Sequence, residues 1–418
     1  RFPVLSFVWS HRTVTISLSR LTLMLAMLVA VTPLAIDMYL PAMQLMAADL
    51  DAPIHHVELS ISGYLFGFAL GQIGGGTLSD RWGRKPAVTL GLLIFSVTSL
   101  ALMYVESVDA LLVLRVFQAL GGGIAVVNSS AIVRDLYSGK EMARVLSMIA
   151  MVMLIAPLVA PLLGALVIET LGWRVIFLTL AVYAGIVGIL FLWMVPESRV
   201  RRPDGDRPRM FAAYLRVFRH RVAMTYVLVL SFSFSGMFAF ITAAPFAYLE
   251  YFEVSPTLFP VLFGANIITM MLCGRINMRL MNRYGPDRLL LAGLSLQFIA
   301  GLGLVLASVW DAGLGTVVVL NMLFVGSLGL VAANATTGCL HFFPEMSASA
   351  NAVIGVVEFC MGALVGLIWT QLHDHTLVPM ASVMAACACL GLLSLLSMRK
   401  ICPHSNDESI SLTTCIKR

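Results

Sequence analysis

Long apolar runs separated by short polar breaks follow one another along the whole chain. A helix needs about 20 mostly apolar residues to cross a bilayer, and twelve runs reach that length. They occupy residues 21–42, 58–79, 87–105, 109–133, 145–168, 173–195, 223–249, 257–281, 288–309, 313–336, 348–371 and 377–398. Because lipid offers the backbone no hydrogen-bond partners, each run is expected to satisfy its own as an α-helix. The pattern predicts an all-α membrane protein with twelve transmembrane helices.

One polar break is much longer than the others and divides the twelve runs into six and six. It covers residues 196–222 and begins with a Pro-, Arg- and Asp-rich stretch typical of a flexible linker. We therefore expect an N-terminal half over 21–195 and a C-terminal half over 223–398. Residues 1–20 and 399–418 are predicted to form an arm and a tail.

Within the central loop, residues 210–221 combine an apolar face with a basic one. The apolar side chains are Phe211, Tyr214, Leu215 and Phe218, and the basic ones are Arg216, Arg219 and Arg221. A helix with two such faces suits the anionic inner leaflet of a membrane. Basic residues that only mark the cytoplasmic side would fit the same stretch equally well.

A short motif occurs once in each half at matching positions. Residues 78–86 read LSDRWGRKP between spans two and three, and residues 280–288 read LMNRYGPDR between spans eight and nine. Leu, Arg and Gly recur in register, and Asn282 stands where the first copy has Asp80. Internal repeats are typical of transporters built from two related halves. We therefore expect two pseudo-symmetric six-helix halves.

Charge is scarce, and its placement predicts the orientation of the helices. The 418 residues are 59% hydrophobic and only 12% charged, whereas soluble domains carry about a quarter charged residues. With the N-terminus in the cytosol, nearly all of the 27 Lys and Arg residues fall in cytoplasmic segments, as the positive-inside rule requires. Both termini are therefore predicted to be cytoplasmic. The net charge of +5 reflects this topology, and no basic patch for nucleic acid is expected.

Three ionisable residues lie inside predicted spans, where a charge is costly and marks a functional candidate. They are Asp37, Arg115 and Glu358. Asp37 and Arg115 are predicted at similar depth, so their charges could pair across a shared cavity while Asp37 still exchanges a proton. A static ion pair that fixes helix packing is the alternative. Glu358 is equally consistent with attracting cationic substrates, with a second proton site, and with a hydrogen bond between helices.

Two further stretches suggest conformational roles. Residues 75–86 (GGTLSDRWGRKP) place Asp80 near a helix end among three cations, so this carboxylate could bond helix termini or an Arg across the bundle. Span five carries small residues and Pro at four-residue spacing, which permits close contact and bending. These residues are Ala156, Pro157, Ala160, Pro161, Gly164 and Ala165. A plain packing kink fits span five as well as a role in conformational exchange.

Span seven is rich in aromatic residues. Residues 232–252 read FSFSGMFAFITAAPFAYLEYF, and the chain contains 24 Met residues. Adaptable aromatic and thioether contacts favour a pocket that accepts varied ligands, with Phe238 and Phe240 among its expected walls. Aromatic residues that face lipid would explain part of the same pattern.

Other classes of function are disfavoured by the sequence. The seven Cys residues form no CxxC pair, and residues 55–56 and 373–375 supply only short His clusters in external loops. Without an ordered third ligand, we expect no metal and no cofactor. A membrane enzyme or sensor is not predicted, because no soluble domain exceeds the central loop and no P-loop, HExxH or Ser/His/Asp arrangement is present.

These motifs together resemble the major facilitator superfamily, and in particular its Bcr/CflA drug-resistance group. IDMYLPAM in span one resembles the signature of the group, and GTLSDRWGRKP resembles the superfamily loop motif. RVFQALGG resembles the span-four motif, and the span-five stretch resembles the antiporter motif, with Ala119, Ala160 and Ala165 where glycine is usual. FSFSGMFAFITAAPFAYLE is very similar to span seven of the group.

The resemblance implies proton-coupled export of drugs, of the bicyclomycin or sulfonamide type, across a bacterial inner membrane by alternating access of the two halves. Asp37 and Arg115 would then couple transport to protons. The expected substrate cavity contains Tyr39, Gln118, Phe238, Phe240 and Glu358. The residues expected to control conformation are Gly76, Asp80, Arg81, Gly83, Arg84, Lys85, Pro161 and Gly164. Glu358 departs from the group, so the resemblance assigns it no role.

The expected partners are a small-molecule substrate, protons and membrane lipid, and the chain is expected to be a monomer. The alternative function is proton-coupled export or import of a small metabolite, such as an amino acid or dipeptide.

Overall fold

The computed structural model describes residues 18–198, 210–343 and 346–401, which are almost entirely helical. The α-helices are α1 (Leu18–Asp37), α2 (Met43–Asp49), α3 (Ile54–Trp82), α4 (Arg84–Leu102), α5 (Val108–Leu136), α6 (Gly139–Leu171), α7 (Arg174–Met194), α8 (Met210–Arg219), α9 (Arg221–Pro245), α10 (Phe259–Val309), α11 (Leu314–Gly326), α12 (Leu328–Leu340), α13 (Ser347–Leu372) and α14 (Val378–Ile401). A 3₁₀ turn, η1 (Leu40–Ala42), follows α1, and a π-helical turn, η2 (Phe246–Tyr251), follows α9. The part of the chain that the structure describes contains no strand, in agreement with the all-α prediction.

The helices supply twelve crossings, as the apolar runs predict. Among the described residues, ten helical segments are long and apolar enough to span a bilayer. One of them, α10, holds two predicted spans joined at Gly285, where the backbone leaves helical geometry. The remaining crossing is α3, which is not among the ten. Polar residues such as Glu58 and Gln72 lower its hydropathy.

The first span differs from the prediction at its outer end. The helix was expected to continue to residue 42, but α1 ends at Asp37 and the chain turns through η1 into α2. Pro41 accounts for the break, because it has no backbone N–H to donate to the carbonyl of Asp37 and its ring crowds that carbonyl. The break leaves Asp37 at a helix end instead of within a continuous helix.

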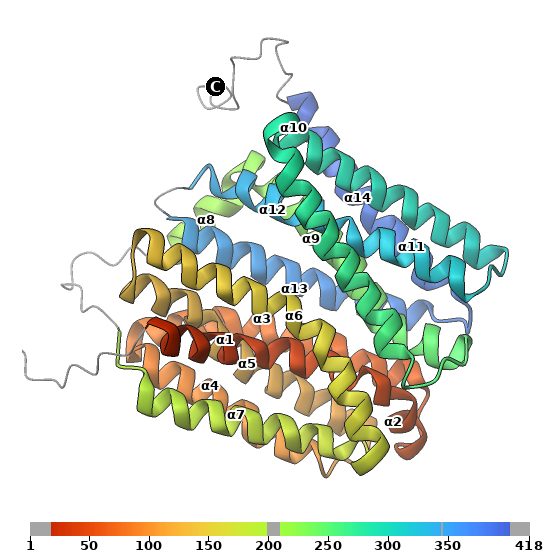
Figure 1. Ribbon diagram of the computed structural model, residues 1–418, viewed down its shortest axis with the longest axis horizontal. Coiled ribbons are helices and arrows are strands. Elements are labelled where there is room, and N and C mark those ends of the chain that lie inside the picture. The colour runs from red at the N-terminus through yellow and green to blue at the C-terminus, as the bar shows by residue number, and fades with distance from the viewer. Residues whose placement is uncertain (1–17, 199–209, 344–345, 402–418) are drawn as a thin grey trace, which may run out of the picture.

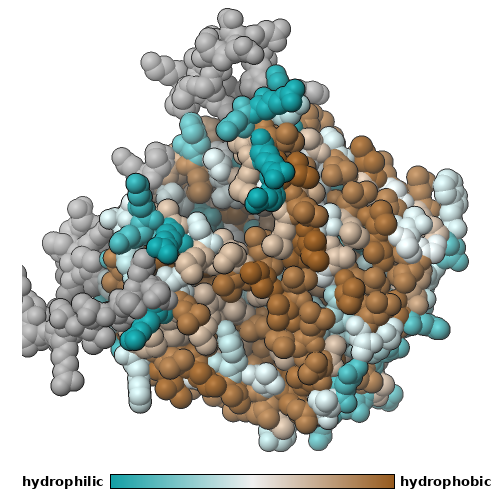
Figure 2. Space-filling model, viewed as in Figure 1, coloured by the Kyte–Doolittle hydropathy of each residue, from teal (hydrophilic) through white to brown (hydrophobic). Residues whose placement is uncertain are grey.

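The two six-helix halves lie side by side. Helices α1 to α7, red to yellow-green, form one bundle, and α9 to α14, green to blue, form the other (Figure 1). Packing of α13 along α3 and of α6 against α10 joins the halves. Hydrophobic residues cover the middle of the face shown in Figure 2, and hydrophilic residues gather toward its ends. This distribution suits a multi-pass membrane protein.

Close contact between α3 and α13 depends on glycines of α13. A Cβ added to Gly366 would lie 2.0 Å from the hydroxyl oxygen of Ser62, and one added to Gly355 would lie 3.1 Å from Oε1 of Gln72. Small residues at such positions let two helices approach closely within a membrane. The glycines therefore form part of the contact between the halves.

The repeated motif makes a similar turn in both halves. Gly83, between α3 and α4, has φ of 109°, and Gly285, inside α10, has φ of 73°. Glycine adopts positive φ without the steric cost that other residues meet. The shared turn agrees with the predicted pseudo-symmetry.

The amphipathic helix predicted in the central loop is present as α8. Val217 is fully buried and packs with Ala350 and Val353 of α13. Leu215 and Phe218 stay 47% and 48% exposed. The helix is thus confirmed, and its contact with the inner leaflet stays a prediction.

Candidate functional site

Asp37 occupies the end of α1 and is almost completely buried. Its side chain is 3% exposed, and its carboxylate makes no hydrogen bond or ion pair with any described residue. Such a carboxylate can bind or release a proton without first breaking an ion pair. Asp37 therefore keeps its place as the leading candidate for a proton carrier.

Helix α6 packs directly against the turn that follows Asp37. A Cβ on Gly164 would lie 1.8 Å from the carbonyl oxygen of Met38, so only glycine fits at this contact. Pro161 is buried less than one turn earlier, and Pro157 also lies inside the helix. The structure thus brings two residues that were predicted to control conformation beside the residue that was predicted to carry the proton.

Arg115 is fully buried in α5 and is held by hydrogen bonds and two aromatic rings. Its guanidinium donates to Oε1 of Gln118 at 2.6 Å and to the carbonyl oxygen of Ala35 at 3.0 Å. It also lies over the rings of Tyr39 and Tyr64, at 4.3 and 4.5 Å from their centroids. Cation–π contacts gain strength when they are shielded from water. Arg115 is therefore a firmly positioned positive charge.

The groups around Arg115 are themselves anchored. The amide nitrogen of Gln118 donates to the hydroxyl of Ser99 at 2.7 Å, and the hydroxyls of Tyr39 and Ser60 share a hydrogen bond of 2.9 Å. Tyr39 and Gln118 are fully buried. In this conformation they support Arg115 instead of lining an open cavity.

Asp37 and Arg115 do not form an ion pair in the described structure. Two nitrogens of Arg115 are taken by Gln118 and Ala35, and its Nε has no partner among the described residues. The bond to Ala35 nevertheless places the cation two residues from Asp37 along α1. The expected ion pair between Asp37 and Arg115 is therefore not formed, although both residues lie near the same end of α1.

The two phenylalanines of span seven belong to different clusters. Phe238 lies 5.7 Å from the ring of Phe359 on α13, whereas Phe240 packs against Tyr248 and Phe263 at 6.1 and 5.9 Å. Both side chains are buried, at 5% and 1% exposure. They do not share one wall of a cavity in this structure.

Glu358 lies near the middle of α13 and is partly exposed. Its carboxylate has no hydrogen bond or ion pair with any residue that the structure describes. The next residue, Phe359, contacts Phe68 of α3 at 4.6 Å, so this part of α13 faces the seam between the halves. Glu358 can therefore meet water or a ligand, in contrast to Asp37.

The loop motif between α3 and α4 is organised by Arg84. Its guanidinium donates to Oδ1 of Asp80 at 3.0 Å, to Oγ of Ser79 at 2.8 Å and to Oδ2 of Asp135 at 3.0 Å. Asp135 lies in the last turn of α5. The Arg partner of Asp80 thus comes from the same motif, and the network ties the loop to α5 within the N-terminal half.

Glu197, after α7, caps α4. Its Oε1 accepts from the backbone N–H of Arg84 at 2.9 Å, and its Oε2 accepts from that of Lys85 at 3.0 Å. A Cβ on Gly83 would lie 2.5 Å from Oε2 of Glu197. Glu197 could not be selected from the sequence, because there it is one more charged residue in a loop.

The other residues of the motif have simpler surroundings. Gly76 is partly exposed, and Arg81 is exposed beside an apolar hollow at the same end of α3. The hollow is lined by Leu70, Gly74, Thr77, Leu78, Arg81, Leu120 and Ile124.

Glu58 is a buried carboxylate that the sequence reasoning missed. It is fully buried near the first residue of α3, where it accepts hydrogen bonds from the backbone of Phe246 at 2.8 Å and from the indole of Trp369 at 3.1 Å. Glu58 is the first residue of a predicted span, and a charge at a span end is ordinary. An indole donor near the external end of another span is the only related signal in the sequence.

Four histidine rings cluster beside this contact. The ring centroids of His55 and His373 are 4.5 Å apart. The ring of His56 lies 4.6 Å from that of His55, and the ring of His375 lies 4.9 Å from that of His373. Burial, followed by the nearby His55 and His375, lowers the pKa of His373 to about 4. Among the described residues, no group of His, Cys, Asp or Glu has an arrangement that could hold a metal ion.

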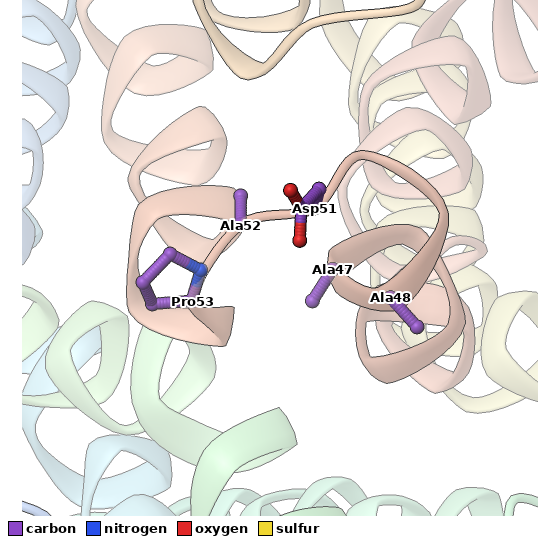
Figure 3. A pocket seen from close by; sticks show the side chains of 5 residues that line it. All are labelled: Ala47, Ala48, Asp51, Ala52 and Pro53. Atoms are coloured by element: carbon purple, nitrogen blue, oxygen red, sulfur yellow. The ribbon is translucent and has the colours of Figure 1, made fainter.

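A shallow pocket lies at the turn between α2 and α3 (Figure 3). It is lined by Ala47, Ala48, Asp51, Ala52 and Pro53. No aromatic or basic side chain lines it, and none of the predicted cavity residues belongs to it.

Comparisons with known proteins agree with this architecture. The sequence model of the Major Facilitator Superfamily matches residues 25–367. The chain is 32% identical over 374 residues to a bicyclomycin resistance protein homolog of Haemophilus influenzae, covering 89% of this chain and 94% of that protein. It is 30% identical over 345 residues to multidrug resistance protein D of Escherichia coli, covering 81% and 85%.

Among solved structures, the fold is similar to a partially occluded inward open conformation of the xylose transporter XylE from E. coli. The TM-score is 0.71 at 14% sequence identity, over 94% of this chain and 99% of that one. At this identity the likeness concerns the fold alone.

Proposed function

This chain belongs to the Major Facilitator Superfamily, and we propose that it exports drugs in exchange for protons across a bacterial inner membrane. The names of the relatives, which are bicyclomycin and multidrug resistance proteins, support drugs as the substrates. The distribution of Lys and Arg supports cytoplasmic termini. Helix ends near the Glu58 contact are then external.

The buried, unpartnered carboxylate of Asp37 is the observation that carries this proposal. A proton from outside neutralises Asp37, the halves exchange their accessible side, and the proton leaves to the cytosol. One charge that moves through 100 mV supplies about 2.3 kcal/mol. That free energy can hold a concentration difference of roughly fiftyfold.

Arg115 is proposed to set the proton affinity of Asp37. It is fixed to α1 through the carbonyl of Ala35, so a change at the end of α1 alters the distance between cation and carboxylate. A closer cation favours the ionised carboxylate, and a more distant one favours proton uptake. Arg115 acts here as a positioning residue.

Helix α6 is proposed to transmit the conformational change to this site. Gly164 contacts the Met38 carbonyl on one side of the site, and α6 also packs against α10 of the other half. Movement of one half against the other therefore displaces the turn beside Asp37. The Arg84 network lies within the N-terminal half, where it keeps the cytoplasmic helix ends together as one body.

The test is proton release in everted, respiring membrane vesicles. Addition of bicyclomycin, or of a sulfonamide, is expected to dissipate the proton gradient with the wild-type protein and to have no effect with Asp37→Asn at equal expression. Asp51→Asn is the matched control, because Asp51 is an exposed external carboxylate, and it is expected to behave as the wild type.

Two results would contradict the proposal. A full response from Asp37→Asn would remove Asp37 as the proton carrier. A wild-type protein that responds to no drug in a broad panel would make a metabolite the better substrate. Glu358→Gln in the same assay shows whether drug-driven proton release also requires the partly exposed carboxylate of Glu358.

A further inference from the structure

Helix α8 is fixed to the C-terminal half along one side. Val217 is fully buried and packs with Ala350 and Val353 of α13. The helix ends before His220, which caps the first turn of α9, because its Nδ1 accepts from the backbone N–H of Ala223 at 3.2 Å. These contacts place α8 at the end of the bundle where α13 begins (Figure 1). They also determine which side of α8 is left exposed.

The exposed part of α8 carries an apolar stripe beside a basic stripe. Leu215 and Phe218 are 47% and 48% exposed, and Arg216 and Arg219 are exposed as well. Residues three apart are neighbours on a helix surface, so the two apolar side chains form one stripe and the two arginines form the other. The offset of one residue separates the stripes by about 100° around the helix axis.

No described carboxylate forms an ion pair with either arginine. The ion pairs among the described residues involve Arg84 and Arg174 instead. The guanidinium of Arg216 has one long contact, 3.9 Å, to the sulfur of Met346, which does not compensate its charge. Uncompensated cations beside large exposed apolar side chains are typical of a helix that lies in the interface of an anionic bilayer.

The position of α8 favours lipid as the partner of this surface. Helix α9 begins at Arg221, directly after α8, and the segment from Arg221 to Tyr251 is itself long and apolar enough to span a bilayer. The exposed stripes therefore lie within about two turns of the level at which a spanning helix enters the membrane. Acyl chains at this level can cover the apolar stripe, and the negative charge of the headgroups attracts the basic one.

We propose that α8 is a binding surface for anionic phospholipid. Leu215 and Phe218 insert between acyl chains, while Arg216 and Arg219 donate hydrogen bonds to lipid phosphates. Because Val217 fastens α8 to α13, the bound lipid holds this end of the C-terminal half at the depth of the headgroups. The proposal concerns the membrane and no drug, so its failure and the failure of the proposed export are separate results.

The test measures which lipid lies beside α8 when the whole chain is placed in nanodiscs. The seven native cysteines are changed to alanine, and Leu215→Cys is labelled with an apolar fluorophore that takes the place of the leucine. The bilayer is a mixture of phosphatidylcholine and phosphatidylglycerol, of which one or the other carries a doxyl quencher on its acyl chain. Because the quencher is on the acyl chain, quenching reports a lipid and no free phosphate.

At equal mole fraction, doxyl-phosphatidylglycerol is expected to quench the label more strongly than doxyl-phosphatidylcholine. Each arginine should enrich the anionic lipid beside α8 about fivefold, and a high salt concentration should reduce this enrichment. Arg216→Gln and Arg219→Gln should each lower the enrichment by that factor. The double variant should be quenched equally by the two lipids.

Arg279→Gln combined with Arg283→Gln is the matched control. It removes two exposed cations from α10 and changes the net charge by the same amount, so it should keep the wild-type preference for phosphatidylglycerol. A further variant, Phe218→Ser, leaves both arginines of α8 in place. Quenching by both lipids should fall in this variant, while the preference for the anionic lipid remains.

Three results would overturn the proposal. Equal quenching of the wild type by both lipids would show apolar contact without selection for charge. A label that neither lipid quenches would show that water or protein covers α8. Loss of the preference in the α10 control, with the preference retained in the double variant of α8, would assign the selection to the cations of α10.

Discussion

Asp37 and Glu58 are both buried carboxylates, but their surroundings give them different tasks. Asp37 has no hydrogen-bond partner among the described residues, so a proton can bind without breaking a contact. Glu58 accepts from two donors of the opposite half, so it links the two halves directly.

Gly164→Ala is expected to destabilise the protein and to impair transport. The new Cβ would lie 1.8 Å from the Met38 carbonyl oxygen, and overpacking of this kind costs about 1–3 kcal/mol. Thermal unfolding in detergent measures the loss as a lower midpoint. In the vesicle assay, proton release should fall, because the turn beside Asp37 is displaced.

The control for this variant is Gly185→Ala in α7. A Cβ there has only the Ser96 hydroxyl nearby, at 3.8 Å, and alanine is the better helix former. Its unfolding midpoint should equal or exceed that of the wild type. Equal midpoints for Gly164→Ala and Gly185→Ala would contradict the close contact between α6 and the turn.

The candidate site was predictable from sequence only where a charge stands alone in an apolar run. Asp37 and Arg115 meet that condition, and the structure places both in the buried core near α1. Glu58 does not, because it begins its predicted span. Its bond to Trp369 joins positions 311 residues apart, and no local pattern records such a pairing.

At the scale of elements, the turn between α3 and α4 holds three helices together. Gly83 provides the positive φ, Arg84 reaches Asp135 on α5, and Glu197 after α7 caps α4. These hydrogen bonds join α4 to α5 and to the residue that follows α7.

Glu197→Gln is expected to lower the free energy of unfolding by about 1 kcal/mol, the usual value of a helix cap. The amide can accept one of the two N–H bonds, but its NH₂ group opposes the other donor. The measurement is the midpoint of thermal unfolding in detergent. Glu106→Gln changes an exposed carboxylate in the loop between α4 and α5 and should leave the midpoint unchanged, whereas an unchanged midpoint for Glu197→Gln would rule out the cap.

The elements themselves were largely predictable, because twelve apolar runs become twelve crossings. Their ends were less so. The first run continues without a charge past Asp37, yet Pro41 stops the helix, and α6 extends several residues beyond its predicted span at its N-terminal end. The length of an apolar run is set by the thickness of the bilayer, whereas the residues at which a helix begins and ends are set by capping residues and prolines.

For the whole molecule, stability should depend on pH through His373, one of the four clustered histidines. The pKa of His373 is lowered from 6.5 to about 4, so the folded, closed form binds fewer protons than the unfolded chain between these values. Its contribution to stability is therefore present above pH 6.5 and is lost as the pH falls toward 4.

The measurement is the midpoint of thermal unfolding as a function of pH. His373→Gln should show a smaller fall of the midpoint between pH 6.5 and 4 than the wild type, because the substituted side chain does not titrate. His341→Gln, an exposed histidine, should follow the wild type. If the midpoint falls equally with pH in all three proteins, protonation of His373 does not affect stability.

The glycines along α13 have a consequence for the speed of exchange between the two accessible states. Gly355 and Gly366 meet α3 without side chains of their own, so the two helices approach closely and many of their atoms are in contact. The dispersion energy of these contacts is lost when the halves part. The barrier then carries a substantial activation enthalpy, and turnover should slow markedly as the temperature falls.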